Sequence, residues 1–311
     1  MPDADHPRSK ITAAEVAPPP LVLSMLPAGP KAKRFTLALV ILSCATCLIL
    51  APFARVPLAR IPAFIPAYEA TLVIIDLITA TLLFGQFSIG RAASLLLLAC
   101  GYVFSGVTTA FHALSFPGAF SDAGLLGGGA QTTAWLYMFW HAGFPLAVIG
   151  YALLRYKAAD WAQRRPAYSI AGGVIVSVAA SVGFTALSTA GETSLPEIME
   201  GSHYTPAMIF VVSTVWCLSL AAILALFSRR PLSVLDLGLT VVQCAWLCDI
   251  ALSAVLNAGR FDLGFYSGRI FGLAATSLVL LLLVLEIVVL YGRVARSIVA
   301  KGKSVTKPSG S

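Results

Sequence analysis

Eight ionisable side chains lie inside long apolar stretches of this chain, and they indicate where it could do chemistry. A charge in hydrocarbon costs roughly 2.5–3.5 kcal/mol on insertion scales, so ionisable residues in such stretches are candidates for ligand binding or proton transfer. A helical rise of ~1.5 Å per residue places most of them in one half of a membrane. The eight are Glu69, Asp76, His112, His141, Asp236, Asp249, Arg269 and Glu286.

One set of these groups should share the outer half of the bilayer, and we predict a ligand-binding site there. Glu69 and Asp76 are seven residues apart, a spacing that places both on one face of a helix. The other acids, Asp236 and Glu286, fall nearer the cytoplasmic side, where Asp236 should lie at the interface and Glu286 has no obvious partner. The predicted binding residues are Glu69, Asp76, His112, Tyr137, His141, Asp249 and Arg269.

Arg269 needs a negatively charged partner if it lies within the membrane. Asp249, on the neighbouring apolar stretch, is the first candidate, with Asp76 or Glu69 as alternatives. Such an ion pair either only fixes helix packing, or it opens when a ligand binds.

His141 combines an ionisable ring with an unusual backbone position. Pro145 has no N–H, so the carbonyl of His141 loses its intrahelical partner and needs a neighbour, a water or a ligand. His112 and His141 could also hold a haem iron from opposite faces, although their expected depths differ by roughly 10 Å. A haem-binding membrane cytochrome is therefore an alternative function, and the sequence predicts no other cofactor and no metal site.

The elements that position these groups should be membrane-spanning helices. The 311-residue chain is 58% hydrophobic and 11% charged, with a mean hydropathy of +0.87. Soluble domains carry about 45–50% apolar and about 25% charged residues, so an ordinary soluble enzyme is excluded, as is a disordered chain. The net charge of +7 is not gathered into a basic block with interleaved aromatics, which excludes a nucleic-acid surface.

Stretches of about 20 apolar residues predict an all-α bundle of eight transmembrane helices near 34–52, 67–87, 92–114, 131–154, 168–190, 206–228, 233–257 and 265–292.

The distribution of basic residues predicts that the N- and C-termini are both cytoplasmic. With the N-terminus inside, 17 of the 21 Lys and Arg residues fall on inner segments. We expect a disordered cytoplasmic tail over 1–33, a membrane domain over 34–295 and a short basic cytoplasmic tail over 296–311. The alternative for the start of the chain is a signal peptide, for which the leader before the first apolar run is long.

Cysteines and small residues in the spans are expected to pack rather than react. All six cysteines fall inside predicted spans, and the pair Cys44 and Cys47 has no nearby histidine to complete a metal site. The fifth span carries small residues at helical spacing, which predicts a close helix–helix contact. These residues are Gly173, Ser177, Ser181 and Thr185.

Four stretches, taken in order, resemble one known family. They are FIPAYE at 64–69 with LLFGQF at 82–87, HALSFPG at 112–118, QTTAWLYMFWH at 131–141 followed by GFP, and FDLGFY at 261–266 followed by GR at 268–269. Their order and spacing resemble the membrane-associated sensor domains of the MASE group, type four, from about residue 34 to about 295. The resemblance maps family motif positions onto Tyr68, Glu69, Asp76, His112, His141, Pro145 and Arg269.

This resemblance implies a multi-pass sensory input domain in a bacterial cytoplasmic (inner) membrane. Such domains are input modules of diguanylate cyclases and histidine kinases and usually continue into a cytoplasmic output domain, which this chain is expected to lack. No catalytic motif is present, so the chain is not expected to be an enzyme. It would bind a small ligand or register a membrane condition and act through a separate cytoplasmic kinase or diguanylate cyclase, unless it is a truncation. A homodimer stays open as an assembly state.

A transporter or proton-coupled channel is the remaining alternative. Buried Asp76, Asp249 and Glu286 could relay protons. Many transporters carry inverted repeats with paired broken helices. The two four-helix halves of this sequence show no obvious self-similarity, which favours the sensory interpretation.

Overall fold

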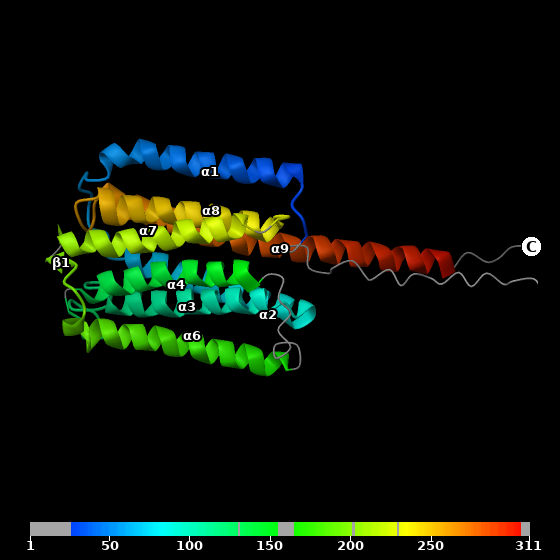
Figure 1. Ribbon diagram of the computed structural model, residues 1–311, viewed down its shortest axis with the longest axis horizontal. Helices are drawn as coiled ribbons and strands as arrows, with labels where there is room; N and C mark the ends of the chain where they lie inside the picture. Colours follow the sequence, from blue (N-terminus) through cyan, green and yellow to red (C-terminus); the bar gives the residue numbers. More distant parts are fainter. Residues whose placement is uncertain (1–25, 130, 155–164, 201–202, 229, 306–311) are drawn as a thin grey trace, which may run out of the picture.

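The computed structural model consists of long helices that run alongside one another (Figure 1). It describes residues 26–129, 131–154, 165–200, 203–228 and 230–305. Within these residues, eight helices are long and apolar enough to cross a membrane, as the sequence predicts. They are α1 (Pro30–Leu50), α2 (Phe64–Gly90), α3 (Ala93–Ser115), α4 (Thr132–Leu154), α6 (Pro166–Thr189), α7 (Pro206–Phe227), α8 (Val234–Ile250) and α9 (Leu263–Val305).

Short elements join the long helices at the end of the bundle opposite to the start of α1. Two antiparallel strands pair Met199 with Tyr204 and Glu200 with His203. A six-residue π-helix directly extends α8, so that the seventh span continues beyond Ile250. The short elements are η2 (Ala51–Phe53), η3 (Glu192–Ser194), β1 (Met199–Glu200), β2 (His203–Tyr204) and η4 (Ala251–Leu256).

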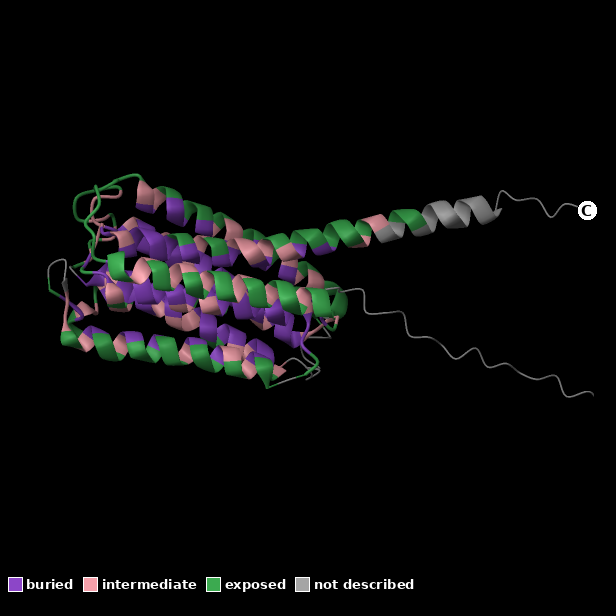
Figure 2. Cartoon of the chain, turned by 90° about the horizontal axis from the view of Figure 1, so that it is seen from above, coloured by how far each residue is buried: buried purple, intermediate pink, exposed green. Residues whose placement is uncertain are grey.

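The two ends of the membrane domain differ from the predicted boundaries. Helix α1 begins at Pro30, so the last residues of the predicted tail over 1–33 are helical, while residues 1–25 lie outside the described residues. Helix α9 continues to Val305, so most of the predicted tail over 296–311 is also helical. Its 43 residues correspond to about 64 Å, roughly twice the thickness of the hydrocarbon core. Helix α9 therefore projects beyond the bundle, at the end where α1 begins (Figures 1 and 2).

The bundle has a central layer of three helices. Buried residues make up 67% of the most apolar window of α3, 56% of that of α4 and 78% of that of α8, against none in α1. Helix α3 packs against α2, α4 and α6, while α8 packs against α1, α7 and α9. Figure 2 shows this order as buried residues gathered on the inner helices and exposed residues on the outer ones.

Large apolar side chains cover the outer faces of the bundle. Leu48 of α1 is 73% exposed and Phe210 of α7 is 76% exposed. A soluble monomer rarely exposes apolar patches larger than a few hundred Å², so these faces must meet lipid. The domain is therefore an integral, multi-pass membrane domain in a lipid bilayer.

Small and hydroxyl side chains hold α6 against α3. Ser177 Oγ donates to the carbonyl of Cys100 over 3.0 Å, and Thr108 Oγ1 donates to Ser181 Oγ over 2.9 Å. Gly173 faces the sulfur of Cys100 closely enough that a Cβ would collide with it. The predicted close helix contact is confirmed for these residues, whereas Thr185 donates to a carbonyl of its own helix.

The two inner acids correct the sequence analysis. Asp236 is buried in the first turn of α8, where Oδ2 accepts from the Ser233 N–H over 2.6 Å and Oδ1 accepts from the Tyr151 hydroxyl over 3.0 Å. Glu286 Oε2 accepts a hydrogen bond from Gln86 Nε2 over 3.0 Å, so the expectation that it has no partner is wrong. Asp236 therefore caps a helix inside the protein instead of facing the interface.

The contact between α3 and α4 leaves no room for a side chain at Gly101. A Cβ there would lie 2.4 Å from Cβ of Ala147. We expect Gly101→Ala to lower the free energy of unfolding in detergent by about 1–3 kcal/mol, the usual cost of overpacking. Gly172→Ala on α6 is the matched control, because a Cβ there meets nothing within 4 Å. Equal stability of the two variants would contradict the packing described here.

Candidate ligand-binding site

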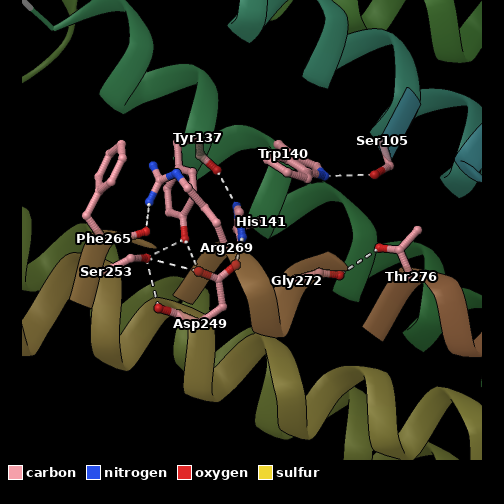
Figure 3. A network of polar contacts seen from close by, with 10 residues as sticks. All are labelled: Ser105, Tyr137, Trp140, His141, Asp249, Ser253, Phe265, Arg269, Gly272 and Thr276. Atoms are coloured by element: carbon pink, nitrogen blue, oxygen red, sulfur yellow. Dashed lines mark hydrogen bonds and ion pairs between the residues drawn. The ribbon is translucent and has the colours of Figure 1, made fainter. Parts of the chain in front are cut away.

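Asp249, near the end of α8, forms the centre of a buried polar network (Figure 3). Its Oδ1 atom accepts hydrogen bonds from Tyr137 Oη over 3.1 Å and from Ser253 Oγ over 3.0 Å. Its Oδ2 atom lies 3.2 Å from Nε2 of His141. The site thus joins α4 to the junction between α8 and η4.

The hydrogen bonds of His141 fix where its protons lie. Nδ1 is 2.8 Å from the carbonyl oxygen of Tyr137, and a carbonyl only accepts, so Nδ1 carries a hydrogen. The contact between Nε2 and Asp249 Oδ2 then requires a further proton, either on the ring or on the carboxyl group. The pair therefore shares one proton between Nε2 and Oδ2, and its charge distribution depends on which atom holds it.

A second histidine–carboxylate pair lies beside the first. His112 Nδ1 of α3 is 2.7 Å from Glu69 Oε1 of α2, and both side chains are buried. The ring of Tyr137 lies 6.3 Å from that of His112 and 3.8 Å from that of His141, measured between centroids. The ring of Tyr137 thus neighbours both histidines.

The backbone around Asp249 is adapted to this network. The π-helix η4 begins two residues later, and π-turns inside helices are frequent at functional sites. Gly268 and Gly272 of α9 face the same carboxylate: a Cβ at Gly268 would lie 2.7 Å from Oδ1, and one at Gly272 would lie 3.1 Å from Oδ2. Two glycines four residues apart let α9 approach closely, as small residues do at membrane helix contacts. Sequence reasoning missed these glycines, although their spacing was a usable signal.

Arg269 does not form the predicted ion pair with Asp249. Its Nη1 atom donates to the carbonyl of Phe265 over 2.9 Å, and its guanidinium lies 3.7 Å from the ring centroid of Phe265 and 5.6 Å from that of Tyr137. Among the described residues, no carboxylate lies within 4.0 Å of this guanidinium, which also removes Glu69 and Asp76 as partners. The prediction was wrong because His141, rather than Arg269, occupies the free oxygen of Asp249.

Asp76 lies deeper along α2 than Glu69 and, among the described residues, makes no direct hydrogen bond to the Asp249 network. It lies two turns along α2 from Glu69, about 10 Å at the helical rise. It is buried against α3, where a Cβ on Gly106 would be 3.2 Å from its own Cβ. Its Oδ2 atom has no hydrogen-bond partner in the described part of the chain. The structure therefore gathers six of the seven predicted residues around Tyr137, and it places Asp76 further along α2.

The site continues outward into groups that the sequence analysis did not include. Arg260, in the loop before α9, donates from Nη2 to Thr133 Oγ1 over 2.8 Å. Tyr204 of β2 donates from its hydroxyl to the carbonyl of Ser253 over 2.9 Å, and burial raises the pKa of this phenol. These residues lie in loops or strands between the spans, so a search restricted to apolar stretches could not find them.

A haem iron held between the two histidines would have to replace the contact between His141 Nε2 and Asp249. The rings of Tyr137 and Trp140 neighbour both imidazoles. Within the described residues, no group of three or more His, Cys, Asp or Glu side chains is arranged to hold a metal ion.

Comparison with protein-family models finds one described as a membrane-associated sensor, integral membrane domain (MASE4), matched over residues 59–291. The chain belongs to this family. The match covers about three quarters of the chain and begins after α1, a narrower range than the 34–295 expected from the motifs. Comparisons with curated proteins and with solved structures find no match. This MASE4 domain is thus a membrane-embedded sensor domain, and the resemblance seen in the motifs is confirmed.

A pair of double-mutant cycles tests which basic group belongs to Asp249. We expect Asp249→Asn and His141→Gln to be coupled by about 1 kcal/mol or more in the free energy of unfolding, because the two side chains are in contact. The cycle of Asp249→Asn with Arg269→Gln should give a smaller coupling, because no direct bond is lost. Unfolding in mixed detergent measures both cycles, and a larger coupling for the arginine would contradict this geometry.

Proposed function

We propose that this MASE4 domain detects a small ligand in the outer half of the membrane and passes the change to the cytoplasm through α9. One observation carries the proposal. The carboxylate of Asp249 is bonded to α4 and lies against Gly268 and Gly272 of α9, the helix that extends beyond the bundle. A change at this carboxylate would therefore act directly on the contact between Asp249 and the two glycines of α9.

The proton shared by His141 and Asp249 gives the site a way to respond. A ligand that competes for the Tyr137 hydroxyl or for Asp249 would alter how this pair divides its proton and its charge. Since Asp249 and His141 are buried, a change in charge there is costly unless the neighbours move. We propose that η4 and α9 respond, because both contact Asp249 and η4 already departs from α-helical geometry.

The proposed setting is a bacterial cytoplasmic membrane with both ends of the chain inside. Lys and Arg are in excess on the segments at one end of the bundle, where α1 begins and from which α9 projects. This excess supports the proposed orientation. Because the family is described as a sensor, we propose signal input rather than catalysis in this chain. The receiver would be a cytoplasmic kinase or diguanylate cyclase, with a homodimer as one way of presenting two α9 helices to it.

Fusions at the C-terminus test the orientation. Green fluorescent protein joined after residue 311 should fluoresce, because it folds on the cytoplasmic side. Alkaline phosphatase at the same point should be inactive, because it requires export to form its disulfides. The same two reporters inserted in the loop near Asp122, between α3 and α4, serve as the control and should give the opposite result. An active phosphatase at the C-terminus would contradict the proposed topology.

A chimeric reporter tests the sensory role. We expect the full chain fused to a diguanylate cyclase domain to give a cyclic-di-GMP output that changes at least severalfold in Asp249→Asn and in Gly268→Ala. The first removes the charge of the network, and the second adds a methyl group 2.7 Å from Asp249 Oδ1. Gly172→Ala is the matched control, because its added methyl group meets nothing within 4 Å. Equal output from all three variants at equal membrane abundance would refute the proposal.

A further inference from the structure

A cavity of about 40 Å³ lies on the outer side of the Asp249 network. Its walls come from α3, α4, β1, β2, α7, η4, the loop before α9 and α9 itself, so it is the point at which most elements of the outer half meet. The polar groups facing it include Arg260, Arg269, Tyr204, Thr133 and His112. The cavity is therefore built from residues that lie far apart in the chain.

The charge around this cavity is unbalanced. Two arginines face it, and none of its lining residues is acidic. The neighbouring acids lie outside the lining of this cavity. Glu69 contacts His112 through Oε1, and its Oε2 atom has no hydrogen-bond partner among the described residues. Asp249 is bonded to His141, Tyr137 and Ser253. Asp262 accepts from backbone N–H groups, including that of Phe265 over 2.8 Å.

Arg260 shows the effect of this imbalance. Its guanidinium lies 5.1 Å from the ring centroid of Phe116 and donates to the neutral Thr133 hydroxyl. Burial lowers its pKa below the ordinary value, and the positive charges of Arg269 and Arg60 lower it as well, while Tyr204 raises it. A bound anion would relieve both effects, because it would supply a counter-charge inside the cavity.

The size and the walls of the cavity limit the ligand. A volume of 40 Å³ accommodates about three waters, since each needs ~10–15 Å³. The lining also contains Met138, Met199 and Met208, whose flexible thioether side chains suit a small apolar group. The ligand should thus have three or four heavy atoms, with a charged end and an apolar end.

We infer that this cavity binds a short-chain carboxylate of about the size of acetate, with its oxygens toward Arg269 and Arg260 and its methyl group toward the methionines. The planar, multiply donating guanidinium suits a carboxylate better than a spherical ion. Bound there, the ligand would lie beside Tyr137 and Ser253, which also bond Asp249. This inference rests on the proposed function and names the ligand class of the same site.

Thermal unfolding of the full-length protein in detergent, with added sodium acetate, tests the inference. We expect a saturable rise in melting temperature that sodium chloride at equal ionic strength and neutral acetamide do not produce. The rise should be lost in Arg269→Gln and in Arg260→Gln. Arg260 is a half-buried loop side chain, so Arg260→Gln still tests the inference if Arg269→Gln does not fold. Arg55→Gln is the matched control, because Arg55 is an outer arginine that does not line this cavity, and it should keep the rise.

Two results would overturn the inference: an equal rise with chloride, or an acetate effect that persists in both arginine variants. The chimeric reporter separates this failure from that of the sensory role. If acetate fails to bind while Asp249→Asn still changes the output, the ligand class is wrong and the sensory proposal stands. If acetate binds but neither acetate nor Asp249→Asn changes the output, the binding site stands and the sensory proposal fails.

Discussion

The need to satisfy one buried carboxylate organises the outer half of this domain. A carboxylate removed from water costs several kcal/mol unless donors replace its hydration. Asp249 meets that requirement with the Tyr137 hydroxyl, the Ser253 hydroxyl and the His141 ring. Each of these donors has a fixed position on its helix, so the carboxylate sets how α4 lies against the end of α8.

This requirement also accounts for the irregular backbone nearby. Ser253 is four residues after Asp249 and bonds both its carbonyl and its carboxylate, within the stretch that winds as a π-helix. Helix α9 can approach this stretch only because Gly268 and Gly272 present no side chain to it. The polar network thus coincides with a close contact between α8 and α9, which links chemistry at Asp249 to the position of α9.

The sequence predicted the spans and the layer of polar groups, because both depend on hydropathy and on residue spacing along a helix. It also placed Glu69, His112 and His141 on inward faces, where the structure has them. It could not identify partners, because depth does not determine the direction of a side chain. Arg269 and Asp249 lie at similar depths, yet Arg269 turns back along its own helix to the Phe265 carbonyl.

Asp249 contacts His141, where the sequence analysis predicted Arg269, and this difference has a functional consequence. Arginine keeps its charge at every physiological pH, so a pair of Arg269 with Asp249 would be a permanent structural link. A histidine ring nitrogen can either donate or accept a hydrogen bond, so the contact between His141 and Asp249 can be rearranged. Arg269 instead lines the outer cavity, while His141 contacts Asp249. In the proposed function, Arg269 would bind the anion, and the contact between His141 and Asp249 would transmit its presence to α9, which extends beyond the bundle.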